Sequence, residues 1–351
     1  MHNTENELKP IIGITMGDPA GIGPEIAVKA LNNSYIYDLC RPLIIGDASV
    51  IAANLKFGNP TFKINPITNV SQSQFNYGSI DIFDLANVDM QKLEHGHVSA
   101  MAGDAAFDAV KKVVELALDR QVDATVTGPI NKEAINLAGH EFSGHTEIYA
   151  YFTSTEKYAM LLVLENLRVI HVSTHVALRQ ACDLVKTDRI LEVIQLLDNA
   201  CRQFGVDNPK IGVAGLNPHA GDGGLFGKEE ETEIRPAIIR AKKLGIQAEG
   251  PVPADTLFSK AKGGFYDGCV AMYHDQGHIP FKMEGFIWDE EHDRMDSVQG
   301  VNITLGLPII RSSVDHGTAF EIAGKGVASA DAMLLAIEYA VKMAQNKSKK
   351  I

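Results

Sequence analysis

Short apolar runs alternate with amphipathic stretches along most of the chain, and this alternation predicts strands separated by helices. Several of the runs are continuously apolar, which is typical of strands covered by helices on both faces. We predict strands at residues 11–15, 43–45, 81–83, 124–127, 159–164, 168–172, 210–215, 269–273 and 302–304. The pattern as a whole favours an α/β fold.

The amphipathic stretches predict five longer helices, at residues 24–31, 104–120, 188–204, 229–244 and 330–344. Asp188 and Ser329 stand where helix N-caps are expected, because their side chains accept hydrogen bonds from the first free backbone N–H groups. Residues 286–296 interrupt the alternation. This stretch is acidic and contains the single Trp of the chain, so we predict a long surface loop.

Composition restricts the classes of function. The chain has 351 residues, which suggests two domains or one large one. Its net charge of -12 argues against a general nucleic-acid binder, which needs a basic face. The sequence has no apolar run of membrane-spanning length and no signal-peptide pattern at its start. The four cysteines form no CxxC pair, so we expect a reduced, cytoplasmic protein.

Two glycine-rich segments follow predicted strands. Residues 16–25, MGDPAGIGPE, join a strand to a helix but lack the third glycine of the dinucleotide fingerprint, which favours a tight packing turn. Residues 217–229 contain Gly-Lys, but Glu229 and Asp222 stand where a P-loop needs Ser or Thr and Gly. A P-loop ATPase is therefore excluded.

Three histidines, His175, His219 and His274, stand just beyond the ends of predicted strands. In open α/β sheets these ends form the ligand crevice, and three neutral imidazoles meeting there would bind a divalent metal. The alternative is that each is an ordinary hydrogen-bonded histidine. Asp275 and Asp255 could orient an imidazole or act as a general base, although Asp255 could equally be a helix N-cap.

Basic and hydroxyl side chains suggest an anion site. Lys282 and Arg311 flank the acidic stretch, and His145-Thr146 offers two hydrogen-bonding side chains. Lys and Arg at one crevice would hold a phosphate or carboxylate by charge-assisted bonds. The alternative is simple surface solvation.

Five motifs that occur in order along the chain together resemble those of one protein family. They are GHEFSGHT (139–146), LNPHAG (216–221), GPVPADTLF (250–258), AMYHDQG (271–277) and GVNITLGLP (300–308), preceded by residues 16–25. With these motifs the chain resembles the PdxA family of 4-hydroxythreonine-4-phosphate dehydrogenases over about residues 11 to 345. Residues 315–326, DHGTAFEIAGKG, are similar to the adenine-binding loop of isopropylmalate and isocitrate dehydrogenases.

The resemblance implies a fold of the isocitrate/isopropylmalate dehydrogenase type, with two α/β/α domains flanking a central cleft. The first domain would comprise residues 1–130 plus 301–351, with the cofactor loop. The second would comprise residues 131–300, with the metal and substrate site and the dimerisation surface. A homodimer with a metal site shared between subunits is implied as well.

The resemblance also implies roles for particular residues. The implied metal ligands are His175, His219 and His274, for Zn, Co or Mg; the substrate-binding residues are His145, Thr146, Lys282, Asn302 and Arg311; the catalytic acids are Asp255 and Asp275; and the cofactor-binding residues are His316, Gly317, Thr318 and Glu321. An acid at Glu321 would repel a 2′-phosphate, so NAD is preferred over NADP.

The implied reaction is oxidation of 4-phosphooxy-L-threonine to a 3-keto acid that decarboxylates to 3-amino-2-oxopropyl phosphate, in pyridoxal 5′-phosphate (vitamin B6, pyridoxine) biosynthesis. One alternative is a sister dehydrogenase of 4-phospho-D-threonate, of 4-phospho-erythronate or of a carboxylated cyclic diol. Phosphate acetyltransferases share the broad fold but need neither the histidines nor the adenine loop, and a non-catalytic sensor is a third class. The connection between Lys282 and Gly300 is longer here than is usual in the family, which suggests an insertion at residues 286–298 beside the implied substrate residues.

Overall fold

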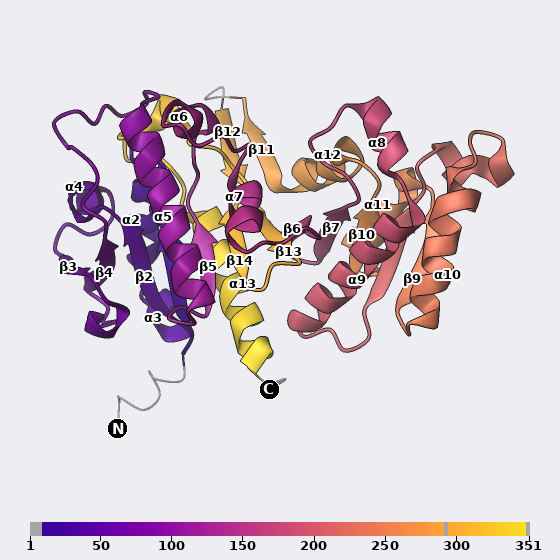
Figure 1. Ribbon diagram of the computed structural model, residues 1–351, viewed down its shortest axis with the longest axis horizontal. Helices are drawn as coiled ribbons and strands as arrows, with labels where there is room; N and C mark the ends of the chain where they lie inside the picture. Colours follow the sequence, from indigo (N-terminus) through magenta and orange to yellow (C-terminus); the bar gives the residue numbers. More distant parts are fainter. Residues whose placement is uncertain (1–8, 291–293, 349–351) are drawn as a thin grey trace. The chain divides into compact units, whose positions relative to one another are not determined.

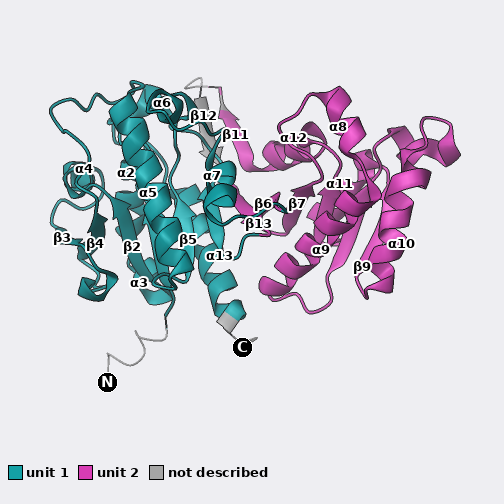
Figure 2. Ribbon diagram, viewed as in Figure 1, with its two compact units in different colours: residues 1–157, 307–351 teal, residues 158–306 magenta. Residues whose placement is uncertain are grey.

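The computed structural model describes residues 9–290 and 294–348. The chain forms two compact units, which Figure 2 shows in different colours. Unit 1 comprises Met1–Lys157 and Leu307–Ile351, and unit 2 comprises Tyr158–Gly306. Residues 131–157, expected in the second domain, thus belong to unit 1, because their helices pack on a helix of that unit. Residues 301–306 belong to unit 2, because they pair with one of its strands.

Unit 1 contains six parallel strands, in the order β3-β4-β2-β1-β5-β14. Their bounds are β1 Ile11–Thr15, β2 Arg41–Gly46, β3 Lys63–Ile67, β4 Ser79–Asp84, β5 Ala124–Thr127 and β14 Arg311–Val314. β1 and β5 begin and end where the apolar pattern predicted. β3 and β14 were not predicted: β3 is half-exposed and contains a proline, and β14 consists mostly of polar residues.

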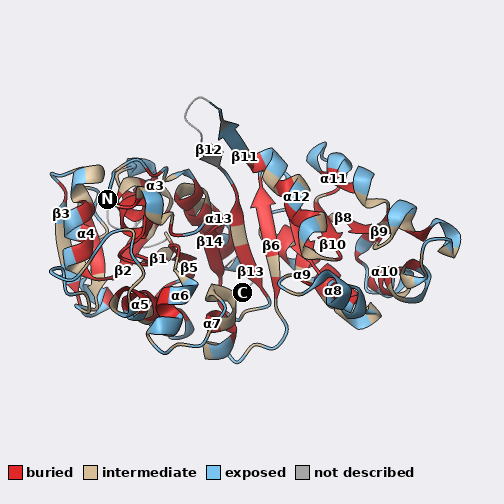
Figure 3. Ribbon diagram, turned by 90° about the horizontal axis from the view of Figure 1, so that it is seen from above, coloured by how far each residue is buried: buried red, intermediate tan, exposed pale blue. Residues whose placement is uncertain are grey.

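Helices cover both faces of the unit 1 strands. The long helix α5 packs on β1, β2 and β5, and α6 and α7 lie against it, while α2, α3 and α13 cover the other face (Figures 1 and 3). The bounds are α2 Gly23–Leu31, α3 Ser34–Leu39, α4 Ala48–Asn54, α5 Ala100–Leu118, α6 Lys132–Leu137, α7 His145–Phe152 and α13 Asp331–Ser348. The apolar stripe of α5 is buried as its spacing predicted, with Val110 and Val113 fully inaccessible.

Unit 2 has a mixed set of six strands, in the order β13-β6-β7-β10-β8-β9. Their bounds are β6 Ala159–Leu164, β7 Leu167–His171, β8 Lys210–Ala214, β9 Gln247–Val252, β10 Gly268–Ala271 and β13 Val301–Leu305. β6 runs antiparallel to both of its neighbours, and β7, β10, β8 and β9 are parallel to one another. The carboxyl ends of β7, β10 and β8 therefore lie side by side at one edge.

The unit 2 helices pack on both faces, with α9 and α10 on one and α11 and α12 on the other (Figure 3). Their bounds are α8 Leu178–Leu184, α9 Thr187–Gln203, α10 Arg235–Lys243, α11 Ala254–Lys262 and α12 His274–Gly285; short helical segments are η1 Leu55–Phe57, η2 Val70–Gln72, η3 Pro218–Gly224, η4 Glu230–Ile234 and η5 Phe320–Ile322. The helix predicted at 229–244 is split into a π-helical segment, η4, and α10. Pro236 at the start of α10 explains the split, because it cannot donate to the preceding turn.

Neither Asp188 nor Ser329 occupies the N-cap position predicted for it. α9 begins one residue earlier than Asp188, and the carboxylate of Glu233 supplies the acceptor for Thr187 N at 2.8 Å. Asp188 instead pairs with Arg240 at 2.6 Å. Ser329 lies two residues before α13, and its Oγ accepts a hydrogen bond from Asp331 N at 3.1 Å.

The acidic stretch 286–296 is not the predicted loop. β11 (Phe286–Asp289) and β12 (Arg294–Val298) form an antiparallel ribbon, and residues 291–293 lie outside the described residues. Ile287 and Trp288 on β11 are more than half exposed. The prediction failed because the charges of this stretch hide the strand pattern, and pairing between its two arms decides the structure.

The α/β class is confirmed, and Figure 3 shows most of the central strands as buried, whereas β11 is exposed. Cys40, Cys201 and Cys269 are buried free thiols, and Cys182 is an exposed one. Burial raises the pKa of the Cys40 and Cys201 thiols to about 12. Among the described helices, none combines the length and apolar character needed to cross a membrane.

Candidate active site

The three histidines singled out in the sequence follow three neighbouring parallel strands of unit 2. His175 follows β7, His274 follows β10, and His219 follows β8. The rings of His175 and His274 lie 5.7 Å apart between centroids and line one cavity of about 400 Å³ with Tyr273 and Asp275. His219 and His175 are exposed, so a ligand can reach them.

The donor set fits a divalent metal in its chemistry. The Nδ1 atom of His274 lies 2.7 Å from Asp275 Oδ1, which leaves Nε2 as the free coordinating atom. The ring of His278 stacks on His274 with centroids 3.7 Å apart and helps fix its plane. No group of three or more metal-binding side chains meets at one point within residues 9–290 and 294–348, so the structure brings together two of the three implied ligands.

The two implied catalytic acids lie beside this cavity. Asp255 and Asp275 line a second cavity of about 360 Å³, between α11 and α12, and Asp275 and Tyr273 also line the first. Asp255 is in the first turn of α11, whose N-cap residue is Pro253, so the N-cap alternative for Asp255 is wrong. The structure therefore places side by side the two acids that the resemblance implied.

The segment that carries His219 has an unusual backbone. Five successive residues, 219–223, have φ between 44° and 80°, the left-handed region that costs L-residues about 1–2 kcal/mol each. The buried carboxylate of Glu230, on η4, accepts hydrogen bonds from Leu216 N at 2.8 Å and Asn217 N at 2.7 Å. It also accepts from Asn217 Nδ2 at 2.9 Å. Glu230 therefore holds the start of the left-handed turn.

Glycine is required inside this turn. At Gly221, where φ is +80°, a Cβ atom would lie 2.7 Å from Glu230 Oε2. Three glutamates stand in succession at residues 229–231, and the middle one points inward and is 1% exposed.

Unit 1 supplies a buried cation, Arg311, with hydrogen-bonding side chains beside it. Arg311, the first residue of β14, is 3% exposed and donates to Thr127 Oγ1 at 3.1 Å and Thr146 Oγ1 at 3.5 Å. Burial lowers the pKa of Arg311 to about 10. Burial, with the charge of Arg311, holds the pKa of His145 well below its usual range, so His145 is neutral. His145, Thr146 and Arg311 thus lie together as the sequence implied.

The other two implied substrate residues belong to unit 2. Lys282 is in the last turn of α12, with its Nζ 5.1 Å from the centroid of the Phe286 ring at the base of the β11–β12 ribbon. Asn302 lies in β13, opposite Leu162 of β6. The ribbon therefore connects the helix that carries Lys282 directly to the strand that carries Asn302.

The implied cofactor loop, residues 315–326, packs against the glycine-rich turn between β1 and α2; together with the two residues that follow it, we call this segment the 315–328 loop. Ile22 N donates to Thr318 O at 3.0 Å, and a Cβ atom on Gly21 would lie 2.9 Å from Thr318 Cβ. This confirms the packing interpretation of the turn: its space is filled by the chain's own loop. Glu321 is exposed, whereas burial lowers the pKa of His316.

Comparisons with known proteins place the chain among dehydrogenases, and hence among oxidoreductases. The model of the family described as "Pyridoxal phosphate biosynthetic protein PdxA" matches residues 38–340. The chain belongs to this family.

Three relatives illustrate the range of the family. A protein of Oceanobacillus iheyensis named "Putative D-threonate 4-phosphate dehydrogenase" is 47% identical over 97% of this chain and 99% of its own length. The 4-hydroxythreonine-4-phosphate dehydrogenase of Klebsiella pneumoniae is 43% identical, with a TM-score of 0.82, covering 96% of this chain and 100% of that one. A terephthalate 1,2-cis-dihydrodiol dehydrogenase of Burkholderia xenovorans is 30% identical, with a TM-score of 0.66 and coverages of 95% and 98%.

Proposed function

We propose that the chain is an NAD-dependent, metal-assisted dehydrogenase of a four-carbon hydroxy acid phosphorylated at C4, and that D-threonate 4-phosphate is its substrate. The pairing of His175 and His274 beside Asp275 is the observation that supports the reaction. The names of relatives at 45–47% identity support the substrate, since eight of them share it.

The second candidate is 4-hydroxythreonine 4-phosphate, which the sequence motifs favoured and which structural relatives at 43–44% identity support. The two substrates share the carboxylate, the C3 hydroxyl and the C4 phosphate, and differ in a hydroxyl or an amino group at C2. The buried Arg311 with Thr146 suits the shared anionic groups and does not distinguish the two candidates.

The residues divide the work as follows. Arg311 and Thr146 bind an anionic group of the substrate, and Asp275 fixes the ring of His274. A bound divalent metal would lower the pKa of the substrate hydroxyl and stabilise the developing negative charge. Asp275, or a water that it holds, would take the hydroxyl proton, and NAD, when bound, would supply the acceptor for the hydride from C3.

The product of this step is a 3-keto acid, which loses carbon dioxide readily. Decarboxylation of the product from D-threonate 4-phosphate leaves dihydroxyacetone phosphate, whereas 4-hydroxythreonine 4-phosphate gives 3-amino-2-oxopropyl phosphate. The 315–328 loop would hold the adenosine part of NAD, with Glu321 on the ribose, and Lys282 and Asn302 would contact the substrate. His219 would complete the metal site, which a homodimer would share between subunits.

The test is NADH formation from each substrate, with and without a chelator. We expect chelator-sensitive turnover of D-threonate 4-phosphate, and loss of both bound metal and turnover in His175→Ala. His140→Gln is the control, because His140 lies in unit 1 and pairs with Asp104. Turnover of only the amino substrate would move the chain to the second candidate, and full activity without metal would contradict the metal assignment.

A further inference from the structure

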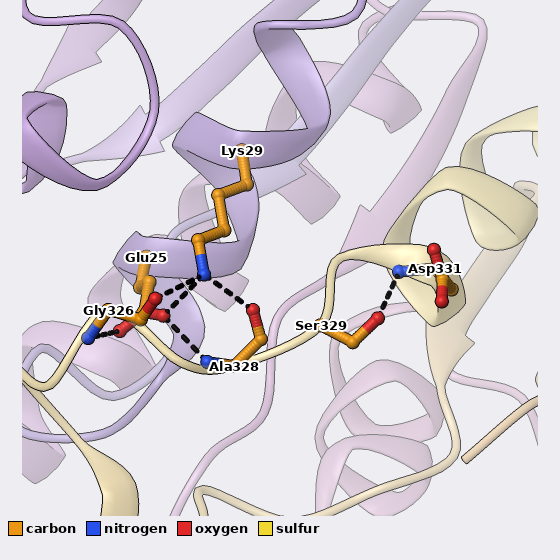
Figure 4. Close-up of polar contacts among 6 residues, drawn as sticks. All are labelled: Glu25, Lys29, Gly326, Ala328, Ser329 and Asp331. Atoms are coloured by element: carbon orange, nitrogen blue, oxygen red, sulfur yellow. Dashed lines mark hydrogen bonds and ion pairs between the residues drawn. The ribbon is translucent and has the colours of Figure 1, made fainter. Parts of the chain in front are cut away.

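Helix α2 carries an ion pair that is bonded to a segment about 300 residues further along the chain. Glu25, in the first turn of α2, is 1% exposed, and Lys29 lies one turn later. The carboxylate of Glu25 accepts hydrogen bonds from Gly326 N at 3.1 Å and from Ala328 N at 2.8 Å. Both contacts lie at the end of the 315–328 loop (Figure 4).

Lys29 completes the arrangement. Its Nζ lies 2.8 Å from Glu25 Oε1 and donates to the carbonyl oxygens of Gly326 at 2.9 Å and Ala328 at 2.7 Å. The two side chains thus bind both the N–H and the C=O groups of the same two residues, as the dashed lines of Figure 4 show. An exposed pair of this spacing contributes little to stability. Here the Glu25 carboxylate is buried and Lys29 is only partly exposed, and because the pair also satisfies four backbone groups it fixes the segment in one position.

The start of α2 holds the same loop at a second point. Ile22 N donates to Thr318 O, and Gly21 allows the backbone of Thr318 to approach closely. The loop is therefore attached to one rigid helix both near its beginning and at its end. Between these points lies Glu321, which the proposed function places on the ribose of NAD.

We infer that Glu25 and Lys29 are positioning residues for NAD: they hold the 315–328 loop in the shape that binds the cofactor. This inference depends on the proposed function, because the placement of NAD on this loop is itself proposed. Glu25 is too deeply buried to touch the cofactor. Loss of the pair should therefore weaken NAD binding and leave hydride transfer in the bound complex nearly unchanged.

A role in folding alone makes a different prediction. If the pair only stabilised unit 1, its loss would reduce the amount of folded protein, while the molecules that remained folded would bind NAD with normal affinity. The dissociation constant of NAD, measured per folded molecule, separates the two roles.

The experiment uses the full chain and isothermal titration with NAD, together with steady-state kinetics. Glu25→Gln and Lys29→Met are each expected to raise the Kd and KM for NAD about tenfold, the size expected for a charge-assisted bond, and to change kcat less than about twofold. Ser329→Ala is the matched control. It removes a bond in the same segment, to Asp331 N, without touching residues 326–328, and should leave the Kd unchanged.

Glu321→Gln tells the two possible failures apart. If the wild-type protein does not bind NAD, or if Glu321→Gln binds it normally, the proposed cofactor site is wrong. If Glu321→Gln weakens binding but folded Glu25→Gln binds NAD normally, the positioning role is overturned. The binding stoichiometry reports the folded fraction, and Glu25→Gln, which keeps the shape of the side chain, covers the case in which Lys29→Met does not fold.

Discussion

Two buried glutamates hold two loops of the molecule, and they do so in different ways. Glu25 in unit 1 accepts bonds from backbone N–H groups and from the cation of Lys29. Glu230 in unit 2 accepts from two backbone N–H groups and the Asn217 amide, and within the described residues no cation lies at ion-pair distance from it. Each carboxylate is about 1% exposed.

The difference lies in how each charge is compensated. In unit 1 a lysine neutralises the carboxylate and also binds the loop carbonyls, so the loop is held through both kinds of backbone group. In unit 2 neutral dipoles alone stabilise the charge, and the backbone beyond them is forced into a left-handed turn. The first arrangement depends on its counter-ion, and the second depends on the N–H groups and on glycine at position 221.

The largest loss of stability is expected for Lys29→Met. This change leaves the buried carboxylate of Glu25 without its cation, and breaking such a pair costs about 3–4 kcal/mol of the free energy of unfolding. Lys29 is 21% exposed, so water recovers part of the charge interaction. Urea unfolding of the wild-type protein and of Lys29→Met measures this difference in the free energy of unfolding. If Lys29→Met lost less stability than Glu230→Ala, the counter-ion would not distinguish the role of Glu25 from that of Glu230.

A smaller loss is expected for Glu230→Ala. Here the backbone N–H groups of residues 216 and 217 lose their acceptor, which costs about 2–3 kcal/mol because water partly replaces it. The same unfolding experiment measures this loss. The affinity for divalent metal should fall with it, because His219 follows the freed segment; unchanged metal affinity would show that His219 does not need this anchor.

A third buried carboxylate, Asp18, lies in the β1–α2 turn and lacks such compensation. Its Oδ1 accepts from Ala20 N at 2.8 Å, while its buried Oδ2 has no hydrogen-bond partner within the described part of the chain. Burial raises its pKa from 3.8 to about 6. The folded protein then binds this proton more tightly than the unfolded chain does, so Asp18 makes the free energy of unfolding fall as pH rises from about 4 to 6.

Asp18→Asn should therefore stabilise the protein by about 1–2 kcal/mol at pH 7, where the wild-type carboxyl is charged. At pH 4 the two proteins should have nearly equal stability, because the acid is then protonated. Thermal or urea unfolding at both pH values measures this. A destabilised variant at pH 7 would mean that the charged form has a compensating partner.

The smallest effect is expected for Glu231→Gln, next to Glu230. Glu231 is exposed and pairs with Arg235 at 2.9 Å, and the hydrogen bond from Arg235 lowers its pKa. Solvent screens this pair, so the urea midpoint should not move measurably. A clear shift of the urea midpoint would show that the exposed Glu231 contributes to stability as the buried Glu230 does.

Part of this picture could be predicted from sequence. Continuous apolar runs located strands such as β1, β5 and β6, and the position of His175 and His274 after strands predicted their approach. These features depend on local pattern and on the common direction of parallel strands.

The roles of the two buried glutamates, Glu25 and Glu230, could not be predicted in the same way. Glu25 follows a glycine-rich turn and has Lys29 one helical turn later, but its backbone partners, Gly326 and Ala328, are about 300 residues away and have no side-chain signal. Which of Glu229, Glu230 and Glu231 points inward depends on the phase of the π-helical segment η4, which a helical period of 3.6 residues does not give. The β11–β12 ribbon was missed because pairing between strands, not local pattern, creates it.

The interrupted course of the chain through unit 1 has a consequence for biosynthesis. Unit 2 is one continuous segment, Tyr158–Gly306, whereas unit 1 needs β14 and α13, which belong to Leu307–Ile351. The ribosome therefore releases all of unit 2 before the last strand and helix of unit 1 have emerged from it. Residues 9–157 must wait, with one edge of β5 and the face of β1 that α13 covers unpartnered, until β14 and α13 have emerged as well. Residues 9–157 are thus made before unit 2 but can reach their final packing only after it.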